Sequence, residues 1–166
     1  MKHLSINTGD QGIKKITELV LGSKLVGFEI PKSQSLTCTW SLRLFFELKD
    51  NSIVLCCSSD VESSDSKSWQ EYGYLKLEII EEKLLSNRDK FNFCKLKPIS
   101  FSKVFMLVNE EDDVVAECGL LLTNDQDEQV LISTSPAPGA ISVKAEFYDG
   151  EYEPEVFIDD LRVLPL

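Results

Sequence analysis

The single histidine of the chain, His3, limits the acid-base chemistry that the protein can carry out. Most hydrolytic mechanisms use a His, so a Ser-His-Asp or Cys-His set would have to be built on this residue. We expect the segment around His3 to fray. The eight glycines stand singly, and no GxGxxG, GxxxxGK[ST], GxSxG or HExxH motif occurs. We therefore expect a protein that is not an enzyme and that uses no cofactor.

Carboxylates are the other side chains that could do chemistry. An acidic pair such as Asp125 and Asp127 could hold a metal ion or transfer protons. A calcium loop that begins at Asp125 would have Val130 at its sixth position, where Gly is needed, and Pro136 at its twelfth, where Glu is needed. We therefore expect solvated acids in turns and no metal site. A carboxylate-dependent enzyme is kept as the third hypothesis for the function.

The cysteines and the first residues favour a cytoplasmic protein. The first ten residues contain no hydrophobic stretch and no small-residue cleavage site, and no apolar run approaches the about 20 residues that span a bilayer. An odd number of cysteines without an export signal indicates free thiols in a reducing compartment. The five cysteines are Cys38, Cys56, Cys57, Cys94 and Cys118.

Charge is unevenly distributed along the 166 residues, whose formal net charge is −11. Residues 1–108 carry 13 acidic and 15 basic side chains, whereas residues 109–166 carry 15 acidic side chains and only Lys144 and Arg162 as bases. A one-sided negative potential attracts basic partners and repels nucleic acid and anionic lipid. We therefore expect a basic protein partner, no nucleic acid and no membrane. A small basic cluster, expected to be a solvated face, is formed by Lys83, Arg88, Lys90, Lys95, Lys97 and Lys103.

Acidic residues alternate with other residues from Tyr148 to Glu155. If this segment is extended, one side carries the carboxylates at intervals of about 6.6 Å and the other side carries the tyrosines. Such a row imitates the phosphates of a nucleic-acid strand; the alternative is an acidic edge that discourages pairing between sheets. The acids of the row are Asp149, Glu151, Glu153 and Glu155, the tyrosines are Tyr148 and Tyr152, and Asp159 and Asp160 extend the row.

The pattern of apolar residues predicts one helix and many strands. Ile13, Ile16, Val20 and Leu21 have helical spacing, with Thr8 or Asp10 as the N-cap and Gly22 as the stop. A mobile surface loop is expected over the serine-rich Ser58–Ser68, and a short helix over Glu81–Arg88. Strands are expected at 24–30, 37–48, 53–57, 72–80, 99–108, 114–123, 129–134, 140–147 and 155–164.

These elements predict the fold class α+β, mainly β. We expect an antiparallel meander sheet, as a sandwich or a half-barrel, with an N-terminal amphipathic helix. Residues 1–166 should form a single domain, because a chain of this length can bury one core and contains no linker and no internal repeat.

Between Glu117 and Val143 the chain has a hairpin followed by a proline turn: Glu117-Cys118-Gly119-Leu120-Leu121-Leu122-Thr123, Asn124-Asp125, Gln129-Val130-Leu131-Ile132-Ser133, Pro136, Pro138 and Ile141-Ser142-Val143. This stretch resembles small bacterial immunity proteins that accompany polymorphic toxins, including those of contact-dependent growth inhibition. The resemblance implies a cytosolic protein that binds a cognate toxin domain and covers its active site or its substrate surface. It assigns no functional residues.

That role agrees with the charge, because a nuclease toxin must be basic to hold its substrate. We expect a monomer that binds a basic nuclease toxin in a 1:1 complex. An acidic secretion chaperone for a bacterial effector, helix-rich and homodimeric, is the alternative. The residues expected to bind the toxin are Tyr148, Asp149, Glu151, Tyr152, Glu153, Glu155, Asp159 and Asp160, with the turn Glu110, Glu111, Asp112 and Asp113.

Overall fold

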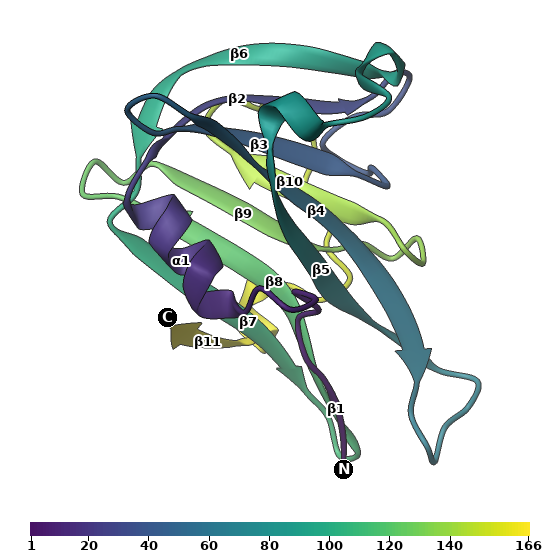
Figure 1. Ribbon diagram of the computed structural model, residues 1–166. Coiled ribbons are helices and arrows are strands. Elements are labelled where there is room, and N and C mark those ends of the chain that lie inside the picture. Colours follow the sequence, from purple (N-terminus) through teal and green to yellow (C-terminus); the bar gives the residue numbers. More distant parts are fainter.

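The computed structural model describes residues 1–166 and consists of two β-sheets that enclose one apolar core (Figure 1). Sheet B contains β2 (Lys24–Pro31), β3 (Leu42–Glu47), β4 (Ser52–Ser63), β5 (Glu71–Glu81) and β6 (Phe91–Ser100). Sheet A contains β1 (Lys2–Leu4), β7 (Lys103–Glu110), β8 (Val114–Thr123), β9 (Gln129–Thr134), β10 (Ile141–Ala145) and β11 (Arg162–Pro165). Three short 3-10 helices span Glu82–Leu84, Arg88–Lys90 and Ile158–Asp160, and the α-helix is α1 (Ile13–Leu21).

The two sheets share one topology. In sheet B, β2 to β5 form a meander and β6 returns to pair antiparallel with β2, so the order is β5-β4-β3-β2-β6. In sheet A, β7 to β10 form the meander and β11 pairs antiparallel with β7, in the order β10-β9-β8-β7-β11. The sequence shows no internal repeat, but the topology repeats.

In each sheet the last strand, β6 or β11, lies at the opposite edge from the strand that precedes it, β5 or β10. The connection between these two strands must therefore cross the sheet. Two such connections exist. The middle crossing, residues 82–90, passes over sheet B, and the C-terminal crossing, residues 146–161, passes over sheet A. Both contact side chains that point away from the core.

The core forms because successive side chains of a strand point to opposite faces. On β3, Leu42, Leu44 and Phe46 point into the core, whereas Arg43 and Phe45 point outward. Burying one such apolar side chain contributes about 1.5–3 kcal/mol. The main cluster of 25 buried residues is therefore the principal source of stability.

Helix α1 confirms the predicted amphipathic helix and its stop at Gly22, whose N–H donates to the Glu18 carbonyl at 3.0 Å. The helix begins later than expected. Gly12 is the N-cap, with φ of 85°, and its own N–H donates to Thr8 Oγ1 at 3.1 Å. The helix joins β1 of sheet A to β2 of sheet B, and its apolar face completes the core with Ile16, Leu19 and Val20.

The predicted fold class is confirmed: the protein is mainly β, with two antiparallel sheets packed as a sandwich and a short N-terminal helix. The strands predicted at 114–123 and 129–134 are β8 and β9, and those at 24–30 and 72–80 are β2 and β5. The meander is confirmed within each sheet, whereas the two crossings and the parallel pairing of β1 with β8 depart from a simple meander.

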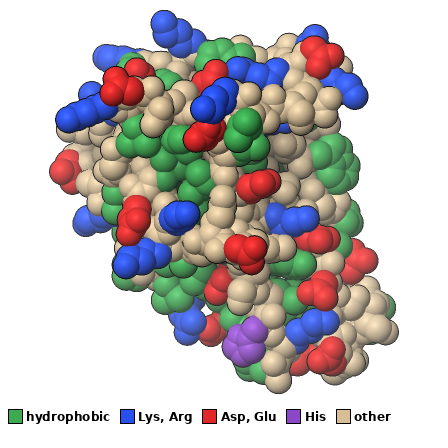
Figure 2. Space-filling model, in the orientation of Figure 1, with side chains coloured by type: hydrophobic (Ala, Val, Ile, Leu, Met, Phe, Trp, Pro, Cys, Tyr) green, Lys and Arg blue, Asp and Glu red, His purple; other side chains and the backbone are tan.

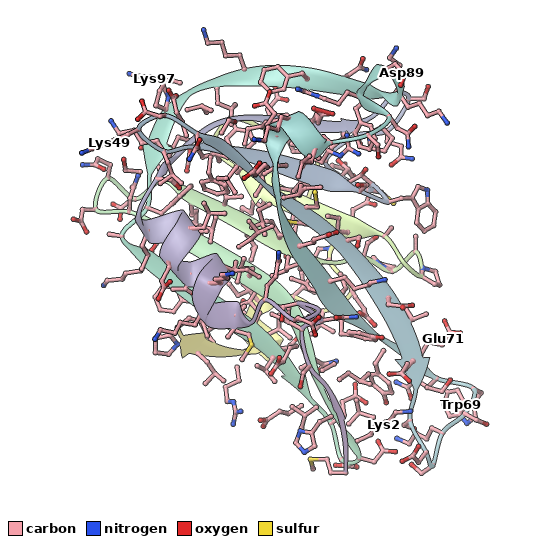
Figure 3. The ribbon with its side chains drawn as sticks, viewed as in Figure 1. Lys2, Lys49, Trp69, Glu71, Asp89 and Lys97 are labelled. Atoms are coloured by element: carbon pink, nitrogen blue, oxygen red, sulfur yellow. The ribbon has the colours of Figure 1, made fainter.

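The loop predicted over Ser58–Ser68 is wrong for its first six residues. Strand β4 continues to Ser63 and pairs with β5 residue by residue, from Ile53 opposite Glu81 to Ser63 opposite Glu71. Pairing with a long partner strand overrides the low strand propensity of serine and aspartate. Only residues 64–70 connect the two strands, and Trp69 stands there 80% exposed (Figure 3).

Three other segments differ from the prediction. Strand β3 begins at Leu42 and not at Thr37, and only Arg162–Pro165 of the strand predicted at 155–164 is strand. The helix predicted over Glu81–Arg88 is a 3-10 turn at Glu82–Leu84.

Strand β6 was not predicted, because only Leu96 and Ile99 of its ten residues are buried and no alternation marks it. Figure 2 shows basic side chains, with some acidic ones between them, along the part of the molecule where Figure 1 places β6.

Candidate partner-binding face

The C-terminal crossing packs on the outer face of sheet A, and its apolar side chains cover this face. Leu107, Leu121 and Leu131 point outward from β7, β8 and β9 and are buried. A small cluster forms where the crossing packs on these leucines through Tyr152, Ile158 and Leu161.

Hydrogen bonds hold the first half of this crossing. The Tyr152 hydroxyl bonds Ser133 Oγ at 2.7 Å, and the Glu153 N–H donates to Ser142 Oγ at 2.9 Å. Thr37 Oγ1 donates to the Glu151 carbonyl at 2.6 Å, so the Tyr148 hydroxyl is the donor in its bond to Thr37 Oγ1. Both tyrosines are therefore engaged inside the protein, and their hydroxyls hold the crossing in place.

Glu155 points inward, so the expected row of four carboxylates on one side is wrong at this residue. Its carboxylate accepts a 2.7 Å hydrogen bond from Thr134 Oγ1 on β9 and bonds from the Gly73 N–H on β5. Burial raises the pKa of Glu155, and the bonds from Thr134 and Gly73 oppose that rise. The residue joins the crossing to both sheets.

The other acids of the crossing face solvent. Residues 146–161 contain seven acidic and no basic side chains. Six of the seven are exposed, and no ion pair of the protein includes any of them. These six, called the acidic face below, are Glu146, Asp149, Glu151, Glu153, Asp159 and Asp160.

A groove of about 660 Å³ opens between the crossing and the end of β10. Tyr148, Tyr152 and Phe157 line it, together with Glu146 and Asp159 of the acidic face and one base, Lys144. Phe157 is 67% exposed although its neighbour Ile158 packs inward. An exposed aromatic ring on an acidic segment suits an interface with a basic protein, because aromatic residues anchor such interfaces and carboxylates steer the partner.

Internal bonds hold three of the four acids in the predicted turn Glu110 to Asp113. Glu110 pairs with Arg162 at 2.8 Å, and Glu111 accepts a 2.8 Å hydrogen bond from the Tyr72 hydroxyl. Burial, and then the hydrogen bond to Glu111, raise the pKa of Tyr72 to about 12.

The other two acids of this turn differ from each other. Asp113 accepts a hydrogen bond from Ser66, which holds the pKa of Asp113 below its usual range. Asp112 makes no side-chain hydrogen bond and no ion pair, so it is the member of the turn most available to a partner.

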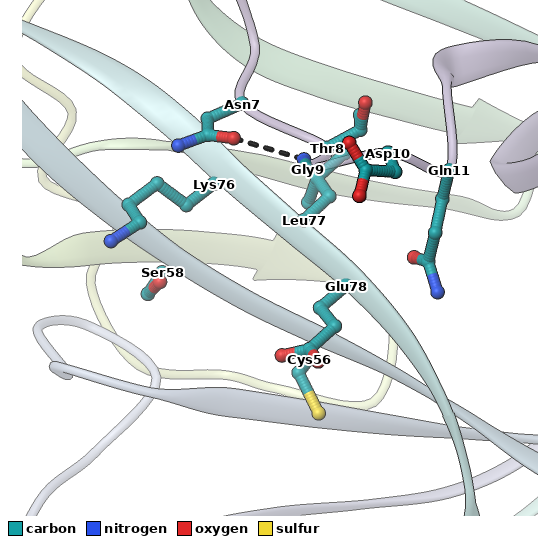
Figure 4. Close-up of a pocket in the computed structure, with 10 residues that line it drawn as sticks. All are labelled: Asn7, Thr8, Gly9, Asp10, Gln11, Cys56, Ser58, Lys76, Leu77 and Glu78. Carbon is teal, nitrogen blue, oxygen red and sulfur yellow. Dashed lines mark hydrogen bonds between the residues drawn. The ribbon is translucent and has the colours of Figure 1, made fainter.

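A second hollow lies beside β5, where Cys56 and Ser58 of β4, Lys76 and Glu78 of β5, and the loop from Asn7 to Gln11 surround it (Figure 4). Asn7 Oδ1 accepts a 2.9 Å bond from the Gly9 N–H and shapes the loop. Burial raises the pKa of Cys56 to about 11, so its thiol stays protonated at neutral pH. No His lines the hollow, and the raised pKa makes the Cys56 thiol a poor nucleophile at neutral pH.

His3 lies on β1, opposite Val115 of β8, so the expectation that this segment frays is wrong. Its side chain makes no hydrogen bond, and it is the only His of the chain. No three His, Cys, Asp or Glu side chains are grouped so as to hold a metal ion. The one α-helix has nine residues, and no helix is long and apolar enough to cross a membrane.

No family model, no curated protein and no solved structure matches the chain. The resemblance of residues 117–143 to bacterial immunity proteins therefore stays a prediction. The structure defines the class as a two-sheet β-sandwich with an acidic crossing on one outer face.

Proposed function

We propose that this protein is a cytosolic immunity protein that binds a cognate toxin domain, a basic nuclease, and neutralises it. The acidic face would cover the active site or the substrate surface of the toxin. The observation that supports this most strongly is that six solvent-facing carboxylates without ion-pair partners lie on one firmly held crossing, which also carries the exposed Phe157.

The way the crossing is held favours binding over mere solubility. Tyr152 and Glu155 attach it to sheet A, and Thr37 attaches it from the connection before β3. A surface that is ordered before binding loses less conformational entropy in a complex. Carboxylates without cations of their own also need no internal ion pair to be broken when a basic partner arrives.

The alternative, a secretion chaperone, gains no support from the fold. A helix-rich homodimer was expected for that role, and the chain has one α-helix of nine residues. The carboxylate-dependent enzyme gains none either, because the acids of the turn are engaged in internal bonds or stand alone.

Affinity purification from the native host at low and at moderate salt, followed by mass spectrometry, tests the proposal. The expected result is the C-terminal domain of a large secreted protein that cleaves RNA or DNA when freed and stops when the protein is added back. Retention of the N-terminal segment of a small effector would support the chaperone instead. A retained domain whose activity the added protein leaves unchanged would contradict neutralisation.

Three charge reversals test the acidic face: Asp149→Lys, Glu151→Lys and Glu153→Lys in one variant. We expect slower association with the toxin and a weaker salt dependence. Glu155 is excluded, because its reversal would detach the crossing. The matched control is Asp10→Lys, Glu18→Lys and Glu47→Lys, which changes the net charge equally at exposed sites elsewhere. Equal affinity and equal salt slope in both variants would show that another face binds.

A further inference from the structure

The free edge of β5 is closed by the chain itself. The Asn7 N–H donates to the Leu75 carbonyl at 2.9 Å, and the Leu77 N–H donates to the Asn7 carbonyl at 2.8 Å. The Gln11 side chain bonds both the N–H and the carbonyl of Ile79 at 2.8 Å. This edge is therefore unavailable to a further strand.

The edges of sheet A are closed or short. The edge of β10 is covered where Thr39 and Ile141 exchange backbone bonds of 2.8 and 3.0 Å and the Val143 N–H donates to the Leu36 carbonyl at 2.7 Å. The outermost strand on the other side, β11, has four residues and ends at Pro165.

Strand β6 is the one long edge left open. Its residues Phe91 to Lys95 pair in unbroken register with Pro31 to Gly27 of β2. No other part of the chain hydrogen-bonds the backbone of Phe91–Lys95. Every second residue of an edge strand points its N–H and carbonyl away from the sheet, so this stretch is a template for a further strand. The register shifts before Ile99, which ends the template.

The side chain of Phe93 gives this edge an apolar centre. It is 51% exposed, and its ring meets Phe45 edge-on at 5.1 Å between centroids. The ring lies over Gly27, where an added Cβ would come within 2.5 Å of it. The ring is thus held in place on one side and open to a partner on the other.

Unpaired lysines surround the edge. Lys32, Lys90, Lys95 and Lys97 are exposed and take part in no ion pair. Figure 3 shows Lys97 toward one end of β6 and Asp89, in the 3-10 helix that precedes β6, beyond the other end. Asp89 is the only acid without an ion pair between residues 82 and 103. Lysines on an edge oppose pairing with a second copy, which would carry the same lysines, but opposite charges across two strands attract.

We propose that the β6 edge, Phe91–Lys95, binds an extended acidic segment of another protein as an added strand. The backbone of the segment would pair with β6, its carboxylates would face the lysines, and an apolar side chain would cover Phe93. This inference is independent of the proposed function, because the acidic face lies on the opposite sheet.

A labelled synthetic peptide in which Glu alternates with Val around a central Phe is the probe, and fluorescence anisotropy at low salt is the measurement. The variant Lys90→Glu, Lys95→Glu and Lys97→Glu should bind it at least about tenfold more weakly. The matched control Lys14→Glu, Lys15→Glu and Lys76→Glu has the same net charge at exposed residues away from β6, with Lys76 on the opposite edge strand β5, and should bind normally. Equal loss in both variants would mean that overall charge and not the edge attracts the peptide, and would overturn the proposal.

Two further measurements test strand addition itself. The same peptide with every backbone nitrogen methylated keeps its charge but cannot pair, so unchanged binding would overturn the proposal. Hydrogen exchange at Phe91, Phe93 and Lys95 should be fast in the free protein and slow with the peptide. If these amides are already protected and the protein has the mass of a dimer, the occupant is a second copy, which would also overturn it.

Discussion

Arg88 donates a 2.9 Å hydrogen bond from Nε to Oε1 of Glu29, a carboxylate 59 residues earlier in the chain, and its Nη2 forms an ion pair with the same oxygen at 2.9 Å. Glu29 is only 1% exposed, and Arg43 bonds its other oxygen at 3.2 Å. Arg43 also stacks on Phe91, 3.8 Å from the ring centroid. One buried acid thus attaches the middle crossing to the outer face of sheet B.

Replacing this acid by Glu29→Ala should destabilise the protein by about 3–5 kcal/mol, because it leaves the buried Arg43 without a counter-charge. The free energy of unfolding in urea is the measurement. Glu47→Ala removes an exposed acid from β3 and should change stability by less than about 0.5 kcal/mol. Similar losses in the two variants would show that the buried cluster has no special role.

Glu155 predicts a pH dependence of stability. Because burial raises its pKa in the folded protein, its stabilising contribution is complete below the pKa of the unfolded chain and is lost as the pH rises through the folded-state pKa. Glu155→Gln keeps an acceptor for Thr134 and Gly73 but does not ionise. The free energy of unfolding of this variant, relative to that of the natural protein, should therefore increase from pH 4 to pH 7.5. Urea unfolding across this range measures it. Glu153→Gln, at an exposed neighbour, should show no such trend.

Gly73 is the close contact on which the C-terminal crossing depends. A Cβ at this position would lie 2.7 Å from Glu155 Oε1 and 2.8 Å from Thr134 Cβ. Gly73→Ala should therefore cost about 1–3 kcal/mol of stability through overpacking. Thermal unfolding is the measurement, with Lys76→Ala on the exposed side of the same strand as control. If Gly73→Ala left the thermal stability unchanged, the C-terminal crossing would be able to shift and accommodate the added Cβ.

The five cysteines should react with N-ethylmaleimide in an order set by exposure and pKa. Cys94 is exposed and should react first, more than about tenfold faster than Cys57 or Cys118. Both of those thiols are buried, and burial raises the pKa of Cys118 to about 12. Mass spectrometry of timed samples gives the order of labelling. In urea, where the protein is unfolded, the five cysteines should react at similar rates. Rapid labelling of Cys57 in the folded state would contradict the packing of β4.

Much of the fold was predictable from local patterns. The buried strands β8 and β9 were predicted at their observed ends, because apolar residues and turn residues alternate clearly there. Strand β6 was not, because an exposed edge strand needs no apolar alternation. The extension of β4 through Ser63 depends on its pairing with β5, which no local pattern reveals.

The candidate site was predictable only in part. The acidity of residues 149–160 was visible in the sequence, but the inward turn of Glu155 was not, because it depends on Thr134 and Gly73 in two other strands. The roles of Tyr148 and Tyr152 as internal anchors likewise depend on partners distant in sequence. The groove beside Phe157 exists only because the crossing brings residues 129–159 together.

The shared topology of the two sheets sets an order for folding. Each meander is built from hairpins whose strands are neighbours in sequence, and such local contacts form early. Strands β6 and β11 must wait until a crossing has closed, since Ser100 pairs with Lys24 and Arg162 with Val108. Strand β1 waits longer still, because Lys2 pairs with Val114. During refolding, the amides of β1, β6 and β11 should therefore be the last to gain protection, and the two four-strand meanders are the units that any early intermediate would contain.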